Sequence, residues 1–126
     1  MTYQVQKLDN NSLLNKTKSL ALSEREITLE ILHHINEIYK RRLYALRGFS
    51  SIFDYATKEL GYSAASAQRR LAAMRLLIEI PEAEEKIKSG ELTLTNAAQA
   101  QKLFQSEAKT GKPKSKEEKK GHLGYA

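Results

Sequence analysis

The chain has 126 residues, a net charge of +6, 40% hydrophobic residues and 29% charged residues. This length fits one compact domain with tails, and no apolar run approaches the roughly 18–20 residues of a membrane span. The absence of cysteine excludes disulfides, thiolate catalysis and thiolate metal sites. Because no basic segment followed by an apolar one opens the chain, we expect no secretory signal. We expect a cytoplasmic protein, associated with the nucleoid if it binds DNA.

Positive charge is concentrated in two places along the chain. Eight basic residues and only two acidic ones lie between Lys40 and Arg75, and six lysines lie between Lys109 and Lys120. The segments before and between these two regions are net acidic. This distribution favours a polyanionic partner, although ordinary solvated helix faces also carry such charges.

The composition predicts an all-α protein, a bundle of about five helices. Good helix formers dominate, and the chain has only two prolines. We expect an irregular leader at residues 1–11, a helical domain at 12–108 and a lysine-rich tail at 109–126. The tail shows no apolar periodicity, so the sequence predicts that it is disordered.

Residues 12–21 are predicted to form a short helix, and a longer one is expected to begin at Ser23. Glu26 follows that serine at the spacing of a capping box, in which each side chain bonds the other residue's backbone. The long helix should end near Gly48, a residue suited to a left-handed helix end. Its expected buried side chains are Ile27, Ile31, Ile35 and Ile38, with Leu32, Tyr39, Leu43 and Leu46.

Four shorter helices follow in the prediction. Ser50 or Ser51 caps the second and Ser63 caps the third, which runs over residues 64–79. Pro81 opens the fourth, which ends at Gly90, and Thr93 or Thr95 starts the fifth. The expected buried side chains are Ile52, Phe53, Ala56 and Leu60, then Ala67, Leu71, Met74 and Ile78, then Ala97, Ala100 or Gln101, and Phe104.

The second and third helices match a helix–turn–helix. "LGYS" at residues 60–63 supplies an apolar residue, a glycine for the turn and a serine cap. In DNA-binding forms of this motif, the start of the second helix contacts base edges. A helical wheel places an exposed strip there, opposite the predicted buried face: Ala65, Arg69 and Ala72, flanked by Ser66, Arg70 and Ala73 on one side and Gln68 on the other. The same local pattern also fits an ordinary helical hairpin.

The exposed strip has the chemistry of a groove-reading helix. Small residues allow close approach, while arginine pairs with guanine and glutamine with adenine. No acidic residue lies between Gly61 and Ile78 to repel phosphate.

We therefore predict a non-enzymatic protein that binds double-stranded DNA. The residues expected at the major groove are Ser63, Ser66, Gln68, Arg69 and Arg70. The residues expected at phosphates are Lys40, Arg41, Arg42, Arg47, Lys58 and Arg75, and the Lys109–Lys120 tail should add non-specific affinity. The alternative is a protein-interaction or homodimerisation module that uses the Ser23–Leu46 helix, with the helix–turn–helix serving only as core.

The stretch "LGYSAASAQRRLAAMRLLIEIPEAEEKIKSGELTLTNAAQAQKL" resembles the DNA-binding region of ParB-type partition proteins. There, too, a helix–turn–helix leads into Arg-Leu-Leu, Pro-Glu, a short helix, a Gly-Glu-Leu-Thr type of turn and an alanine-rich helix. With "RGFSSIFDYATKELGYS", residues 23–108 are more similar still to the N-terminal helical region of HNH endonucleases of predatory bacteria and myxobacteria. Arg70 departs from the partition-type pattern, which has an apolar residue there. The resemblance implies a DNA-binding helical domain.

The nuclease half of that second family has no counterpart in the pattern of this chain. An HNH site needs several histidines and an asparagine on a ββα-metal scaffold, and the chain holds only His33, His34 and His122. His33 and His34 are adjacent, about 100° apart on a helix, whereas a metal-binding pair prefers a spacing of four. We expect no catalytic residue, metal, cofactor or small-molecule substrate, and the chain would correspond to the non-catalytic part of such a nuclease.

Overall fold

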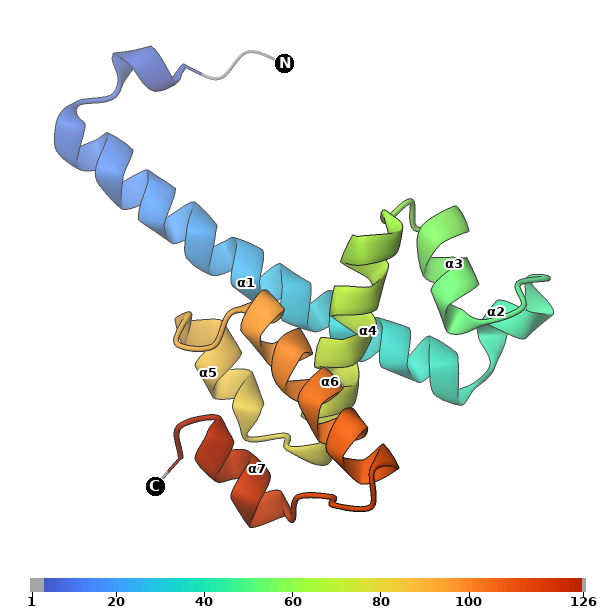
Figure 1. Ribbon diagram of the computed structural model, residues 1–126. Coiled ribbons are helices and arrows are strands. Elements are labelled where there is room, and N and C mark those ends of the chain that lie inside the picture. The colour runs from blue at the N-terminus through green and yellow to red at the C-terminus, as the bar shows by residue number, and fades with distance from the viewer. Residues whose placement is uncertain (1–3, 126) are drawn as a thin grey trace.

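The computed structural model describes residues 4–125, and this part of the chain is all-helical, without strands. A 3-10 helix, η1 (Val5–Lys7), precedes seven α-helices, where about five were expected. Their bounds are α1 Asn10–Lys40, α2 Leu43–Leu46, α3 Ile52–Lys58, α4 Ala64–Glu79, α5 Ala83–Ser89, α6 Leu94–Lys109 and α7 Lys116–His122 (Figure 1). The all-α prediction is confirmed.

Helix α4 lies at the centre of the fold and makes its most extensive contact with α6. Alanines at the contact let the two backbones approach: Ala67 and Ala73 of α4 and Ala97 of α6 are fully buried. Phe104 of α6 fills the space beside them. Helices α1, α3 and α5 pack against other sides of α4, so that its middle and end are surrounded.

The predicted caps of three helices are confirmed. Ser51 Oγ accepts a hydrogen bond from Asp54 N at 3.0 Å, and Ser63 Oγ does so from Ser66 N at 3.1 Å. Thr93 Oγ1 accepts from Asn96 N at 3.0 Å, which begins α6 at Leu94. Each oxygen satisfies a backbone donor that the first helical turn leaves free.

The prediction that a new helix begins at Ser23 is wrong, because α1 runs unbroken from Asn10 to Lys40. Its cap is Asp9, whose carboxylate accepts from Ser12 N at 3.2 Å. The segment between this cap and Ser23 consists largely of residues compatible with a helix, so nothing interrupts it. The helix also ends earlier than Gly48, because Arg42 takes a left-handed φ of 55°.

The buried face of α1 differs from the predicted one. Leu29, Leu32 and Ile35 are buried, whereas Ile27 is 56% exposed and Leu46 is 80% exposed. Ile31 and Ile38 are half-buried at the edge of the core. The isoleucine series thus lies beside the core-facing side of α1, and only Ile35 belongs to both. Similarly, Leu60 and Ile78 were expected inside but are 40% and 50% exposed.

The prediction of a disordered tail is also wrong. Residues 116–122 form α7, capped by a reciprocal pair in which Ser115 Oγ accepts from Glu118 N and Glu118 Oε1 accepts from Ser115 N. Leu123 packs against the core, and the His122 ring meets Phe104 edge-to-face at 5.5 Å. The tail therefore carries a small apolar surface that the core needs.

Carboxylates on α4 and at the start of α5 hold α7 in place. Lys119 Nζ lies 2.9 Å from Glu79 Oε2, and Lys120 Nζ lies 3.0 Å from Glu82 Oε2. Lys116 Nζ approaches the other oxygen of Glu82 at 3.4 Å. The lysines that the sequence indicated as solvated charge thus sit at helical spacing opposite acidic residues of the body.

Removing residues 113–126 should destabilise the protein. The deletion strips the ion pairs from α4 and α5 and uncovers Phe104, for a combined loss of about 1–2 kcal/mol. For a domain of this size that corresponds to a fall in Tm of about 3–10 °C. Thermal unfolding followed by circular dichroism measures it, and an unchanged Tm would contradict the docked tail.

Acid should release α7 before it unfolds the rest. A hydrogen bond from its own backbone N–H, followed by Lys120, lowers the pKa of Glu82 from 4.5 to about 2. Because the folded pKa is the lower one, this stabilisation is complete above pH 4.5 and is lost as the pH falls toward 2. We expect the NMR signals of α7 to shift over that range ahead of those of α6.

Glu82→Gln should loosen α7 already at neutral pH. Glu85→Gln is the matched control, since Glu85 is exposed on the same helix without an ion pair in the described residues. An equal response of both variants would show that Glu82 does not hold the tail.

Candidate nucleic-acid interface

The first two turns of α4 project beyond its contacts with α1 and α6. Ala64, Ala65 and Gln68 are exposed, and Ser66, Arg69 and Arg70 are half-buried. From Leu71 onward the helix enters the core, and Ala72 and Ala73, which the sequence placed near the exposed strip, are 6% and 0% exposed. Only the segment Ala64–Arg70 can therefore approach a large partner end-on.

Two contacts within this segment fix the Arg70 side chain. Its Nη1 donates to the hydroxyl and, at 3.3 Å, to the backbone oxygen of Ser66. Its guanidinium lies 4.4 Å from the centre of the Tyr62 ring, a cation–π geometry. Tyr62 was not among the predicted site residues, and its position next to the Ser63 cap is the signal that identifies it.

Gln68 and Arg69 are the freer members of the segment. Gln68 is exposed, and Arg69 has no carboxylate partner among residues 4–125. Ser63 stays committed as the helix cap, because its hydroxyl accepts from Ser66 N. The polar side chains that can meet a ligand here are thus an amide and a guanidinium one residue apart.

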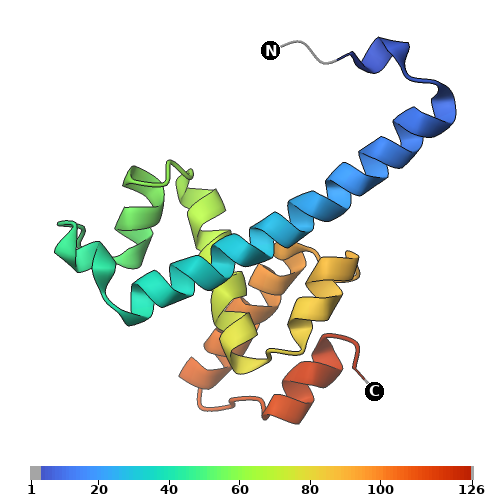
Figure 2. The ribbon, with the colours of Figure 1, turned by 180° about the vertical axis from the view of Figure 1, so that it is seen from behind.

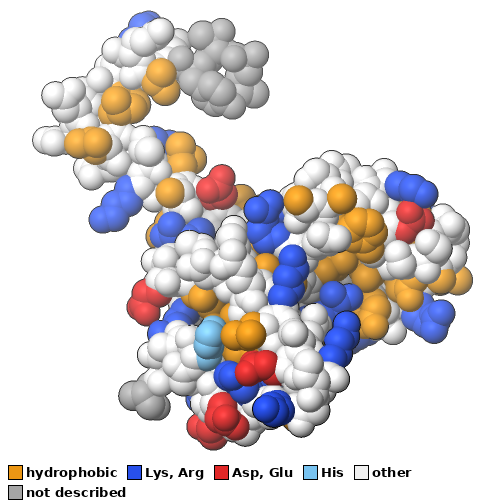
Figure 3. Space-filling view, in the orientation of Figure 1, with side chains coloured by type: hydrophobic (Ala, Val, Ile, Leu, Met, Phe, Trp, Pro, Cys, Tyr) orange, Lys and Arg blue, Asp and Glu red, His pale blue; other side chains and the backbone are white. Residues whose placement is uncertain are grey.

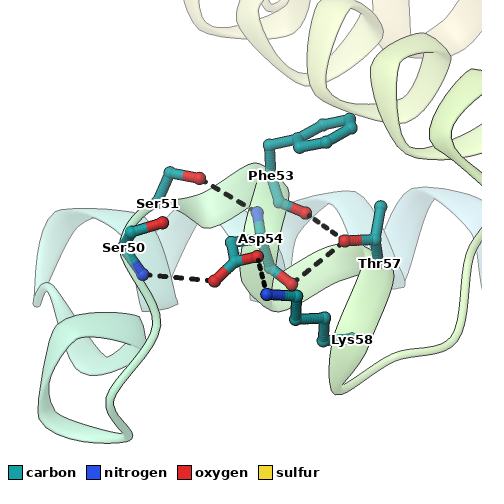
Figure 4. Close-up of polar contacts among 6 residues, drawn as sticks. All are labelled: Ser50, Ser51, Phe53, Asp54, Thr57 and Lys58. Carbon is teal, nitrogen blue, oxygen red and sulfur yellow. Dashed lines mark hydrogen bonds and ion pairs between the residues drawn. The ribbon is translucent and has the colours of Figure 1, made fainter.

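At the start of α3, Asp54 binds Lys58 (Figure 4). Its carboxylate accepts from Lys58 Nζ at 2.9 Å and from Ser50 N at 3.3 Å. The hydrogen bond from Lys58 is the main cause that lowers the pKa of Asp54 below its ordinary 3.8. Lys58 is 70% exposed on its side chain, so its ammonium remains open to a second anion.

The remaining predicted phosphate contacts fall into two groups. Arg41 is paired with Glu37 at 2.7 Å and Arg47 with Glu59 at 3.2 Å, both at exposed positions. The other group has no carboxylate partner among the described residues: Lys40, Arg42 and Arg75. Lys40 and Arg42 are exposed at the end of α1, and Arg75 is half-buried on α4.

Basic and acidic side chains are divided between two ends of the domain. Figure 3 shows Lys and Arg side chains over α4 and around α2 and α3, with few acidic ones among them. At the other end, tail lysines face carboxylates: Lys114 binds Glu107, and three more pair with Glu79 and Glu82. The end that carries α3 and the start of α4 is therefore the end with uncompensated positive charge.

The histidines are arranged singly. His33 Nε2 lies 2.5 Å from Glu84 Oε1, while His34 Nδ1 lies 2.6 Å from the backbone oxygen of Glu30. Within residues 4–125, no group of three or more His, Asp or Glu side chains is placed to hold a metal ion. In the same residues, no helix is both long and apolar enough to cross a membrane.

Comparisons of the chain with protein-family models, curated proteins and solved structures find no match. The resemblance to partition proteins and HNH endonucleases therefore stays a prediction from the sequence.

The turn between α3 and α4 depends on Gly61, which has a φ of +79°. A Cβ added there meets no atom within 4 Å, so a substitution costs only the left-handed conformation. We expect Gly61→Ala to lower the free energy of unfolding by about 1–2 kcal/mol, measured by urea titration.

Gly121→Ala is the control, because Gly121 lies within α7 with ordinary helical φ and open space around it. Alanine there should be neutral or should stabilise by up to about 1 kcal/mol. Equal effects at the two glycines would refute the conformational role of Gly61.

Proposed function

We propose that α3, the turn at residues 59–63 and α4 form a helix–turn–helix that binds double-stranded DNA without catalysing a reaction. The observation that carries this proposal is the projecting start of α4, where small residues stand beside unpaired polar ones. Ala64 and Ala65 permit close approach of the backbone, and Gln68 and Arg69 reach beyond it. These properties suit insertion into the major groove.

In this proposal Gln68 and Arg69 contact base edges. Ser63 and Ser66 line the groove side of the same turn, where a serine hydroxyl can contact either a base or a phosphate. Arg70 is held by Ser66 and Tyr62, so its charge acts from a fixed position at the groove edge. A held guanidinium loses less side-chain entropy on binding than a free one.

Phosphate contacts come from the basic residues around the reading segment. Lys40, Arg42 and Arg75 are available without breaking an ion pair. Arg41, Arg47 and Lys58 exchange a carboxylate for a phosphate or contact both, at little cost, because exposed ion pairs contribute about 0–1 kcal/mol each. The tail contributes little, since four of its six lysines already face carboxylates at the other end of the domain.

The test compares Gln68→Ala/Arg69→Ala with Lys102→Ala/Gln105→Ala. Both pairs remove one amide and one positive charge, and Lys102 and Gln105 are exposed on α6. We expect the α4 variant to lose about tenfold or more in affinity for random-sequence duplex DNA, since a good base contact contributes about 1–3 kcal/mol. The α6 variant should lose far less. Fluorescence anisotropy at two salt concentrations measures both affinities.

Equal losses in the two variants, or unchanged binding by a folded α4 variant, would remove α4 from the interface. Affinity of the unaltered protein should fall steeply with salt, because bound lysine and arginine release counterions from DNA. A protein that binds no duplex at low salt would overturn the proposal as a whole.

A further inference from the structure

The first half of α1 extends away from the body of the protein (Figure 1). Every described residue up to Glu24 is exposed, and the buried residues of α1 begin at Leu29. Leu13 is 40% exposed and Leu20 is 56% exposed, and Figure 3 shows hydrophobic side chains along this part of the helix. A bare helical segment of this length is marginal in water without a packing partner.

The exposed apolar residues of α1 lie on one stripe. Leu13, Leu20 and Ile27 recur every seven residues, and Ile31 and Ile38 continue the stripe at the complementary heptad position. The stripe lies about 120° round the helix from Leu32, which faces the core. Seen from behind, α1 lies in front of α4, α5 and α6 and leaves its outer side uncovered (Figure 2).

The second half of the stripe borders a groove of about 280 Å³. Its apolar lining comes from α1 and from the end of the α3 region: Ile27, Ile31, Ile35, Ile38 and Leu60. The projecting half of α1 supplies leucines of the same stripe but no groove. The two halves are therefore complementary, one offering knobs and the other a place to receive them.

We propose that two copies of the chain pair through this stripe as an antiparallel helix pair, the first half of each α1 lying in the groove of the other copy. Leu13 of one copy then faces Ile38 of the other, and Leu20 faces Ile31. Thr17 faces His34 in the same register. This inference does not rest on DNA binding.

Charge selects the antiparallel direction. A parallel pair would set Glu24 against its own copy and His34 against its own copy, within the heptad seam. The antiparallel register sets Glu24 across from Ile27, where its methylenes can pack and its carboxylate can reach water. On the flank of the seam, Lys16 comes opposite Glu37, whose Oε1 is left free by the bond from Arg41 to Oε2. Opposite charges at flanking positions set partner and orientation in coiled coils.

The oligomeric state tests the pairing. Analytical ultracentrifugation of the full chain should show a dimer, and Leu20→Glu should raise its dissociation constant by about tenfold or more. Leu14→Glu is the control, because Leu14 is 68% exposed on the line of Leu32, away from the stripe. A monomeric unaltered chain, or equal effects of the two variants, would overturn the proposal.

Disulfide trapping tests the direction, since the chain has no cysteine of its own. Chains carrying Thr17→Cys and chains carrying His34→Cys are mixed and oxidised mildly. Both positions are exposed, so folding should persist, as circular dichroism can verify. The antiparallel register predicts crosslinks between the two kinds of chain. Crosslinks within one kind would indicate a parallel pair and sink the register. DNA is absent from both assays, so their outcome is separate from that of the binding test.

Discussion

The packing of α4 against α6 is the constraint on which the rest of the structure depends. Alanines at Ala67, Ala73 and Ala97 bring the two backbones close, and this closeness leaves room for Phe104 but for no larger rearrangement. Because Leu71–Leu77 is enclosed on several sides, the helix can offer a partner only its first two turns. The interface is therefore small and rigid, and its side chains are placed by the core rather than by a loop.

The same packing divides the charges. Glu79 at the end of α4 and Glu82 at the start of α5 lie at the end of the domain remote from the α4 N-terminus, where they face lysines of α7. The tail therefore neutralises the acidic end, and the net positive charge of the domain remains at the other. Without this arrangement the carboxylates would stand unpaired on the surface and reduce the attraction of the domain for a polyanion.

Local signals made the centre of the fold predictable. Ser51, Ser63 and Thr93 cap helices because their oxygens meet backbone donors three residues on, which depends on sequence alone. The tail was missed although "SKEE" at residues 115–118 is a capping box, because its lysines find their carboxylates only in three dimensions. The face of α1 was misassigned because the helix carries two apolar faces, and periodicity does not say which one the core covers. At the candidate site, exposure of Gln68 was foreseen, but the hold of Tyr62 on Arg70 required the structure.

Two apolar faces on one helix imply two partners, and a two-fold pair of α1 helices would bear on how DNA is read. An antiparallel pair has its axis at the midpoint between Leu13 and Ile38, so the axis relates the two α4 helices as well. A two-fold protein that inserts one helix per copy fits an inverted repeat in the duplex, with a spacing set by the protein. Since α1 is continuous from Asp9 to Lys40, its stiffness would fix that spacing. Shortening the projecting half would then weaken dimerisation and affinity for such a repeat together, while leaving the contacts of each α4 unchanged.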